Sequence, residues 1–328
     1  MKKKLVRMCQ KIYNYKRECT MDKISIIIPC YNEQEVLNDF YCKIEEVTNE
    51  MEDVEFEYYF VDDGSSDCTY SILKKLKESN DKIRVLRFSR NFGKEAAMYA
   101  GFEHINGNYV AVMDADLQDP PSLLKEMYQL IKEKGYDCVG ARRTNRVGEP
   151  AIRSFFAKIF YKILRQITGM DVVDGARDFR LMKREMVNAV LEVKEYNRFS
   201  KGIFAWVGFE TKYLEYENIE RKKGNTKWNF WKLFKYSIEG IVSFSTVPLF
   251  FSSILGFLIC ISASVWFIRI IIGYFLNGTS GDGFATLVCL LLIWGGVLLF
   301  AIGILGIYIA RLYLEVKKRP LYIVKEEL

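Results

Sequence analysis

Hydrophobic and polar positions divide the chain into two parts with different patterns. Between residues 23 and 142, short apolar runs alternate with stretches whose apolar residues recur at helical spacing. Short apolar runs bounded by turn residues are typical of buried strands, and the spaced pattern is typical of amphipathic helices. Strands are expected at 23–29, 56–63, 82–89, 109–116 and 137–142, with helices at 33–50, 67–79, 94–105 and 120–135. Strands that alternate with crossover helices predict an α/β fold with a doubly wound, mostly parallel sheet.

The second part contains two long runs without charge, at 240–268 and 283–310. Each run is longer than the ~20 apolar residues that cross a bilayer core. We therefore predict a C-terminal two-helix transmembrane hairpin, with two buried core helices as the alternative. Basic residues flank both runs, so the positive-inside rule places the preceding domain on the cytoplasmic face of the cell (plasma) membrane. The expected boundaries are helices at 242–272 and 284–310, an external loop at 273–283 and a cytoplasmic tail at 311–328.

Two further segments mix aromatic, aliphatic and basic residues in the way that interfacial amphipathic helices do. One covers about 150–167, and the other, rich in Trp and Lys, covers 228–241. A helix packed on the sheet is the alternative for the first segment. The basic N-terminal segment 1–22 has scattered apolar residues and no signal-peptide core, so we expect a membrane-surface helix or a disordered lead-in. Residues 23–227 would then form the cytoplasmic domain.

Composition and charge limit the classes of partner and metal site that are expected. The net charge of +6 suits a protein held against an anionic membrane, and no nucleic-acid-binding motif accompanies it, so nucleic acid is not an expected partner. The eight cysteines include no Cys-x-x-Cys pair, so the usual metal-ligand spacing is absent. In a cytoplasmic protein these thiols are expected to stay reduced. With His104 as the single histidine, a zinc enzyme is not expected.

Polar residues follow every expected strand. Ligands of open parallel sheets bind beyond the carboxyl ends of the strands, so these residues should face one crevice. The strand ends carry Pro29-Cys30-Tyr31-Asn32-Glu33, Asp62-Asp63-Gly64-Ser65-Ser66, Ser89-Arg90-Asn91-Phe92-Gly93-Lys94, Asp114-Ala115-Asp116-Leu117-Gln118 and Gly140-Ala141-Arg142-Arg143. Neither a GxGxxG motif nor a P-loop motif is present, which argues against a dinucleotide or P-loop site.

The acids after the fourth strand predict a cation site. Asp114 and Asp116 are two residues apart, so an extended backbone puts them on the same side. With Gln118 they offer the oxygen ligands that Mg²⁺ or Mn²⁺ prefers, and such a metal would help to neutralise a diphosphate. A helix cap with a turn is the alternative for the Asp-x-Asp pair, and Asp119 is expected to cap the next helix. Asp63 is placed to accept hydrogen bonds from a base or ribose.

Seven segments resemble, in this order, the polyprenyl-phosphate glycosyltransferases of glycosyltransferase family 2, which include bactoprenol glucosyltransferases and dolichyl-phosphate mannose synthases. They are IPCYNEQE, VDDGSSDCT, RFSRNFGKEAA, MDADLQDPP, DFRLMKR, RFSKGIFAWVGF and RKKGNTKW. The resemblance covers about 23–312 and implies a GT-A-type fold, Mg²⁺ or Mn²⁺ as cofactor, and inverting transfer of one hexose from a nucleotide sugar to a membrane lipid phosphate. It also implies a homo-oligomer, with a tetramer as one form. Lys201 and the segment GNTKW depart from the family pattern on the acceptor side.

The resemblance also implies roles for individual residues. The nucleotide sugar would contact Pro29, Tyr31, Glu33, Asp63, Arg90, Lys94, Asp114, Ala115, Arg142, Arg221 and Lys227. The metal would be held by Asp114, Asp116 and Gln118. The catalytic residues would be Asp116, Asp178 and Arg142, and Arg142, Arg221 and Lys227 would contact the donor diphosphate or the acceptor phosphate. For Asp178 we expect a positioning role, in which it orients sugar hydroxyls or pairs with Arg177 or Arg180, and a helix N-cap is its alternative role.

The expected reaction is transfer of glucose from UDP-glucose to undecaprenyl phosphate. A phosphate monoester has a second pKa of about 6 and is mostly dianionic at neutral pH, so a strong general base is not required. GDP-mannose, UDP-GlcNAc and UDP-Gal are alternative donors. A processive polysaccharide synthase would need a longer membrane pore and a Gln-x-x-Arg-Trp motif. A catalytically inactive, membrane-anchored nucleotide-sugar-binding module is the alternative from another class.

Overall fold

The computed structural model describes residues 21–144, 173–217, 242, 245–277 and 283–328. It contains two compact units, one built on a sheet and one of two long helices. The predicted interfacial segments at about 150–167 and 228–241 lie outside the described residues. The same holds for Arg221, Lys227 and nearly all of the N-terminal segment 1–22.

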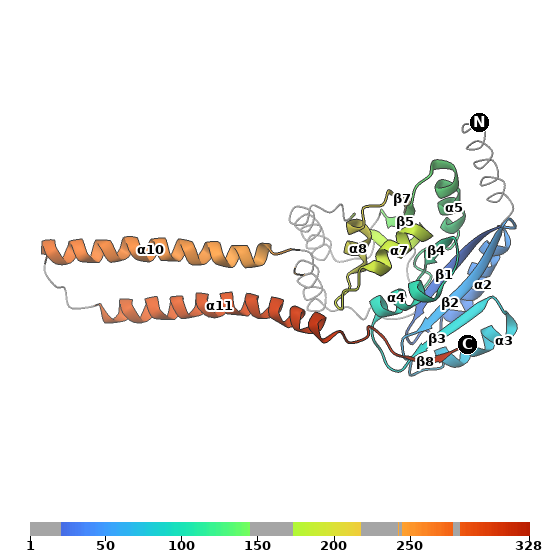
Figure 1. Ribbon diagram of the computed structural model, residues 1–328, viewed down its shortest axis with the longest axis horizontal. Helices are drawn as coiled ribbons and strands as arrows, with labels where there is room; N and C mark the ends of the chain where they lie inside the picture. The colour runs from blue at the N-terminus through green and yellow to red at the C-terminus, as the bar shows by residue number, and fades with distance from the viewer. Residues whose placement is uncertain (1–20, 145–172, 218–241, 243–244, 278–282) are drawn as a thin grey trace, which may run out of the picture. The chain divides into compact units, whose positions relative to one another are not determined.

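The sheet has eight strands in the order β7-β5-β6-β4-β1-β2-β3-β8 (Figure 1). The strands are β1 (Asp22–Cys30), β2 (Val54–Asp62), β3 (Ile83–Phe88), β4 (Tyr109–Val112), β5 (Cys138–Arg143), β6 (Ala176–Lys183), β7 (Thr211–Tyr216) and β8 (Val324–Glu327). All run in one direction except β6 and β8, which are antiparallel to their neighbours. The predicted mostly parallel sheet is confirmed, and its five predicted strands are β1 to β5.

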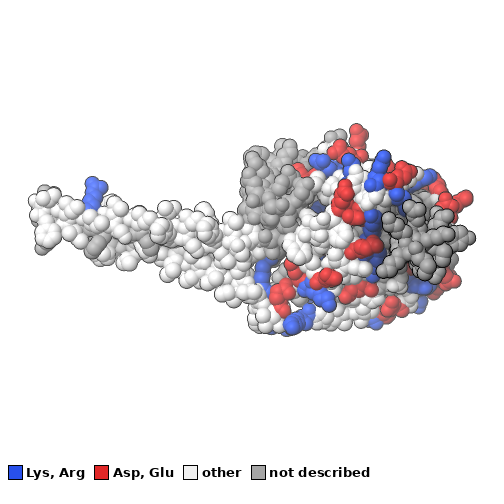
Figure 2. Space-filling model, turned by 45° about the horizontal axis from the view of Figure 1, so that its top comes forward, with Lys and Arg blue, Asp and Glu red and all other residues white. Residues whose placement is uncertain are grey.

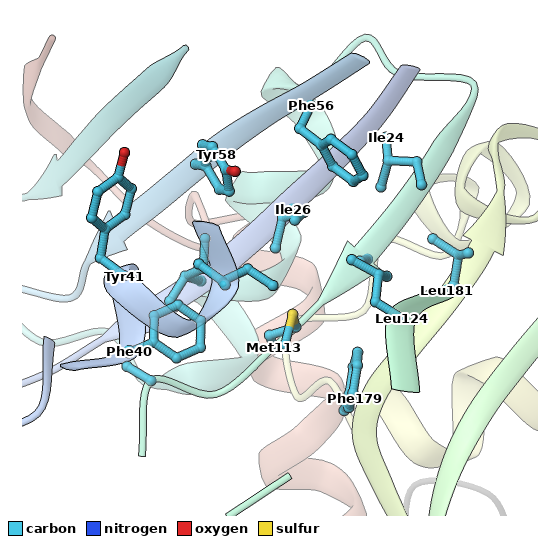
Figure 3. Close-up of a cluster of buried hydrophobic side chains, with 14 of the residues drawn as sticks. Ile24, Ile26, Phe40, Tyr41, Phe56, Tyr58, Met113, Leu124, Phe179 and Leu181 are labelled. Carbon is cyan, nitrogen blue, oxygen red and sulfur yellow. The ribbon is translucent and has the colours of Figure 1, made fainter. Parts of the chain in front are cut away.

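Helices cover both faces of the sheet, which explains why its central strands are apolar on both sides. Within the described residues of this unit the helices are α2 (Leu37–Asn49), α3 (Thr69–Ser79), α4 (Lys94–His104), α5 (Leu123–Lys134), α7 (Arg184–Glu192) and α8 (Ser200–Trp206). On one face α2, α3 and α5 pack over a cluster that includes Ile24, Ile26 and Phe179 (Figure 3). On the other face lies α4, where a Cβ at Gly101 would come within 2.4 Å of the Ile27 side chain. Consecutive residues of β1 therefore point into opposite helical layers, as strand geometry requires.

Three strands were not predicted. β6 enters the sheet between β4 and β5 and is antiparallel to both. Asp178 lies inside β6, and the next helix, α7, begins at Arg184, so the helix N-cap alternative for Asp178 is wrong. At the other edge β8 pairs with β3, with Leu86 opposite Glu327. The tail after residue 310 therefore ends as an edge strand of the sheet.

The second unit consists of α10 (Val247–Asn277) and α11 (Phe284–Lys317), which lie side by side. Both are long and apolar enough to cross a membrane, with candidate spans at Val247–Trp266 and Ile293–Lys317. α10 begins at Val247 rather than at 242, and Pro248 suits its first turn because a helix needs no backbone N–H donor there. Tyr308 Oη donates to the Ser245 carbonyl at 2.6 Å. Charged side chains are almost absent from the face of these helices that Figure 2 shows.

Candidate functional site

The carboxyl ends of β1, β2, β3 and β4 meet at one edge of the sheet because these strands are parallel. Hydrogen bonds connect the loops that follow β1 and β2. Asp63 N donates to the Cys30 carbonyl at 2.9 Å, and Asn32 N donates to Ser65 Oγ at 3.0 Å. Asn32 has a φ of +55°, which is uncommon for a residue other than glycine. The first two predicted strand-end clusters therefore form one structure.

Three residues predicted to contact the nucleotide lie at the end of β1 and in the loop that follows it. Pro29 and Glu33 are half-buried, and Tyr31 is 39% exposed. The Glu33 backbone N–H donates to Thr69 Oγ1 at 2.9 Å, which connects this loop to the start of α3. The loop is fixed through its backbone, so the Tyr31 ring is presented at the strand-end edge of the sheet.

Asp63 organises the next loop. Its two carboxylate oxygens accept hydrogen bonds from the backbone N–H groups of Phe92 and Gly93, at 2.6 and 2.9 Å. Burial raises the pKa of Asp63 to about 6, against the lowering effect of these two hydrogen bonds. Asp63 was predicted to accept from a base or ribose, and in this structure both oxygens accept from the β3–α4 loop. Arg90, in the same loop, stacks over the Phe92 ring with its guanidinium carbon 4.2 Å from the ring centre.

The loop after β2 approaches the β3 end closely. Gly64 has a φ of +67°, and a Cβ on it would lie 2.5 Å from the carbonyl carbon of Arg90. Only glycine fits this combination of conformation and space. The sequence Asp62-Asp63-Gly64 therefore serves to bring the two strand-end loops together.

An acidic pair with a lysine between its members stands at the ends of β4 and β6. Lys94 Nζ lies 2.7 Å from Asp114 Oδ1 and 2.8 Å from Asp114 Oδ2, and it also bonds Asp178 Oδ2. β4 and β6 are antiparallel with Val112 opposite Arg180, so two residues further along, Asp114 comes opposite Asp178. Like charges in opposed positions repel, and the Lys94 ammonium offsets this repulsion.

The electrostatics of this trio follow from the contacts. Burial disfavours each charged form, but attraction to the two carboxylates raises the pKa of Lys94. The positive charges of Lys94 and Lys201 outweigh burial at Asp178 and hold its pKa well below the ordinary value. Burial raises the pKa of Asp114, and the nearby Asp178 and Asp116 add to this effect while Lys94 opposes it. The site therefore attracts positive charge.

Asp178 was predicted to pair with Arg177 or Arg180, but its ion pair in this structure is with Lys94, and both arginines have other contacts. Arg177 Nε donates to Asp119, at 2.9 Å to Oδ1 and 3.3 Å to Oδ2. Arg180 is 2% exposed, its Nη2 donates to the Arg177 carbonyl, and its guanidinium carbon lies 3.8 Å from the centre of the Phe204 ring. Alternation along β6 explains the outcome for Arg177, because residues 177 and 178 point to opposite faces. Arg180 shares a face with Asp178, and its positive charge helps to lower the pKa of Asp178.

Asp119 also differs from its predicted role. Instead of capping α5, its buried carboxylate accepts from Arg177 and from the Tyr216 hydroxyl. α5 begins at Leu123, three residues after Pro120, so Asp119 lies too early in the chain to serve as its N-cap. The ion pair attaches the end of the Asp-x-Asp loop to β6 and β7.

The predicted metal ligands lie in one tight turn. Asp116 Oδ1 accepts from Gln118 N at 3.1 Å, and Leu117 between them has a φ of +56°. Such a backbone conformation is costly for leucine and is typical of functional loops. Ala115 is buried at 3% exposure, which fixes the backbone between the two acids. Gln118 Oε1 accepts from Arg177 Nη2 at 3.1 Å in this structure.

Arg142, predicted to be catalytic, lies at the end of β5. Its Nε donates to the Asp174 carbonyl at 3.2 Å, and its Nη1 donates to Glu215 Oε1 at 3.1 Å. These partners belong to the β5–β7 side of the sheet, across β6 from Asp114. Arg142 and Asp63 therefore lie on opposite sides of β4 and β1 along the strand-end edge.

The chemistry of the donor set fits a divalent cation. No group of three or more His, Cys, Asp or Glu side chains is arranged around a common point within the described ranges. Mg²⁺ commonly takes only one or two carboxylates and completes its coordination with substrate phosphates and water. Asp114 and Asp116 supply two such carboxylates, and the ammonium of Lys94 already stands against Asp114 as a positive charge.

Sequence reasoning missed Arg177, Asp119 and Tyr216 as supports of the site. It also missed the contact of Glu95 with Ser200, in which the Ser200 backbone N–H donates to Glu95 Oε2 at 3.1 Å and joins α4 to α8. Local patterns carry no signal for these pairs, because Asp119 before two prolines has the local sequence of a helix cap. Ser200 does lie within the segment RFSKG, one of those that carry the resemblance.

Comparisons with known proteins agree with the motifs. The model of the family described as glycosyl transferase family 2 matches residues 25–191. CsbB of Bacillus subtilis is 44% identical over 92% of this chain and 91% of its own length. A prophage bactoprenol glucosyl transferase homolog of Escherichia coli is 38% identical over 92% of this chain and 98% of its own. The bactoprenol glucosyl transferase of Shigella phage SfV is 39% identical over 93% and 99%.

Among solved structures, a mannosyltransferase from Pyrobaculum calidifontis in complex with GDP-Man and Mn²⁺ aligns with a TM-score of 0.46 at 17% identity, over 66% of this chain and 61% of that one. A likeness at this level says nothing about the donor or metal of the present chain. The matches in sequence are decisive, because they extend over more than nine tenths of the chain at up to 44% identity. The chain is a glycosyltransferase and belongs to glycosyltransferase family 2.

Proposed function

We propose that this glycosyltransferase transfers one glucose residue from UDP-glucose to a polyprenyl phosphate, undecaprenyl phosphate, with inversion at the sugar carbon. The observation that carries the proposal is the strand-end edge, where the Asp-x-Asp turn and Asp178 meet Lys94 at the ends of β4 and β6. The names of the near full-length relatives support the lipid acceptor and the sugar.

In the proposed reaction an oxygen of the acceptor phosphate attacks C1 of the sugar. The bond between C1 and the oxygen of the donor diphosphate breaks, and the nucleoside diphosphate leaves with the bonding electrons. The acceptor is mostly dianionic at neutral pH, since its second pKa is about 6, so no proton has to be removed. A divalent metal held by Asp114 and Asp116 would offset the charge that develops on the leaving group.

The residues of the chain then divide into donor and acceptor sides. We assign the nucleotide to the loops after β1, β2 and β3, with Tyr31, Asp63 and Arg90 as its contacts. Asp178 is a weak base because Lys94 and Lys201 hold its pKa low, so we assign it a positioning role beside the sugar rather than proton removal. Arg142, with Arg221 and Lys227 from outside the described residues, would attract the acceptor phosphate.

We further propose that α10 and α11 cross the membrane and keep the catalytic domain at the cytoplasmic face. Their length and apolar composition support this, because each is long and apolar enough to cross a membrane. A polyprenyl phosphate resides in the same membrane, so anchoring the enzyme there would raise the effective concentration of its acceptor. A homo-oligomer stays a prediction.

The test is transfer by the purified full chain in lipid nanodiscs that contain undecaprenyl phosphate. Radiolabelled UDP-glucose, UDP-Gal, UDP-GlcNAc and GDP-mannose are supplied separately, with Mg²⁺ or Mn²⁺, and the lipid product is analysed. We expect one glucose per lipid, and loss of about 100-fold or more in rate for Asp116→Asn. Asp39→Asn, an exposed acid on α2, is the matched control and should keep full activity.

Each alternative has its own outcome in this assay. Transfer from GDP-mannose or another UDP-sugar in place of UDP-glucose would change the donor and leave the lipid acceptor in place. A polymeric product would point to a polysaccharide synthase. Nucleotide binding without transfer from any donor would favour an inactive binding module, and full activity of Asp116→Asn would refute the metal assignment.

A further inference from the structure

We propose that Lys94 is an exchangeable internal counter-ion: it occupies the oxygens of Asp114 in the absence of ligands and moves to the donor diphosphate when the divalent metal is held. The metal would then bind tightly only together with a nucleoside diphosphate. This inference rests on the proposed function, since it concerns the metal and donor of that same site.

The first argument is competition for the same atoms. Lys94 Nζ contacts both oxygens of Asp114, at 2.7 and 2.8 Å, and it also contacts Asp178. A divalent cation at the Asp-x-Asp turn needs at least one oxygen of Asp114, because Asp116 alone is a single ligand. Lys94 therefore has to release Asp114 before the pair of carboxylates is available.

The second argument is the electrostatic demand of the pair. Asp114 and Asp178 come opposite each other by the register of β4 and β6, and their side chains are 22% and 19% exposed. Two carboxylates held this close and mostly shielded from water repel unless a cation stands between them. Lys94 supplies that cation at rest, which keeps the site assembled before any ligand arrives.

The third argument is that Lys94 can leave without distortion of the fold. It is the first residue of α4, and its side chain is 40% exposed. A lysine ammonium sits on a flexible stem with several rotatable bonds and can change partners by side-chain rotation alone. The oxygens of a diphosphate would replace the carboxylate oxygens that Lys94 gives up.

The consequence is positive coupling between metal and nucleotide. Each ligand makes the binding of the other more favourable, and by thermodynamic linkage the factor is the same in both directions. Without the lysine charge, Asp114 is available from the start. The metal alone should then bind more tightly, and the nucleotide should add less to its affinity.

The experiment measures Mn²⁺ binding by the full chain in detergent, from the electron paramagnetic resonance signal of free Mn²⁺, alone and with UDP or GDP. For the wild type we expect weak binding of Mn²⁺ alone and at least about tenfold tighter binding with the nucleotide, since two charge-assisted hydrogen bonds are exchanged. Lys94→Met should bind Mn²⁺ alone about tenfold more tightly than the wild type and show a smaller effect of nucleotide. Lys94→Arg, which keeps the charge, should resemble the wild type.

Lys125→Met removes another lysine that forms an ion pair on a helix, with Glu50 at 3.4 Å, and should leave Mn²⁺ binding unchanged. Unfolding temperatures of all variants establish that each is folded. Equal or weaker binding of Mn²⁺ alone by folded Lys94→Met would overturn this inference. That result would not contradict the proposed sugar transfer. Absence of Mn²⁺ binding in every variant with either nucleotide would overturn the metal assignment of the proposed function together with this inference.

Discussion

Replacement of Asp119 by serine separates two roles for this residue. Serine is a good helix N-cap, so a capping role would survive in Asp119→Ser. The structure instead gives Asp119 an ion pair with Arg177 and a hydrogen bond from Tyr216, and a serine side chain is too short and uncharged to replace them. We therefore expect Asp119→Ser to be strongly destabilising.

The magnitude follows from burial. Removal of one partner of a buried ion pair costs about 3–5 kcal/mol, because the other charge is left uncompensated. The Asp119 side chain is 3% exposed, but that of Arg177 is 26% exposed, so water can solvate part of the guanidinium that remains. We expect a loss of about 2–4 kcal/mol in the free energy of unfolding, or about 5–15 °C in Tm for a domain of this size.

The assay is thermal unfolding of the full chain in detergent at pH 7, followed by tryptophan fluorescence. Ser122→Ala is the matched control, because Ser122 stands at the N-cap position of α5 without a side-chain capping bond and should change stability by less than about 0.5 kcal/mol. The double variant Asp119→Ser/Arg177→Met should recover part of the loss by removing the orphaned charge. A Tm for Asp119→Ser equal to that of the wild type would refute the buried ion pair.

Three further predictions concern the same unit. Gly64→Ala should cost about 1–3 kcal/mol, because its φ is +67° and the new Cβ would lie 2.5 Å from the Arg90 carbonyl carbon; an unchanged denaturation midpoint would contradict this close approach. Tyr322→Ala should cost about 1–2 kcal/mol by removing the stack on Phe88, whose ring centre is 5.0 Å away, whereas Tyr322→Phe should keep most of it. The pKa of Asp63 is raised from 3.8 to about 6, so the folded state binds more protons between these values and stability falls as pH rises through that window, by up to about 3 kcal/mol. Asp63→Asn should lack this fall in Tm across the window, and identical profiles for the two proteins would refute the shift.

Local sequence pattern was sufficient for the first half of the domain. Apolar runs such as 109–112 form strands because they are buried on both faces, and the helices between them begin and end near their predicted limits. The acids directly after β4 were recognised as a site because charge at the end of a buried strand needs a partner. The two apolar helices were also predictable from the sequence, because their length and lack of charge can be recognised without knowledge of tertiary contacts.

The edge strand β8 could not be predicted from the sequence, and the reason is physical. All four residues of β8 are exposed, and the strand is rich in charge, so it carries neither the alternation nor the apolar run that identifies a strand. Charged edge strands of this kind protect a sheet from pairing with other chains, and their composition therefore resembles that of a loop. Only the pairing with β3 identifies β8 as a strand.

The sequence alone thus determined the parallel sheet, the helical pair and which strand ends carry the polar residues, because each depends on the spacing of neighbouring residues. The tertiary structure decided which charges meet. Asp178 is 84 residues from Lys94, and Arg177 is 58 residues from Asp119. Both pairings follow from the insertion of β6 beside β4, and the free energy that selects this order lies in contacts between distant segments, which no local pattern records.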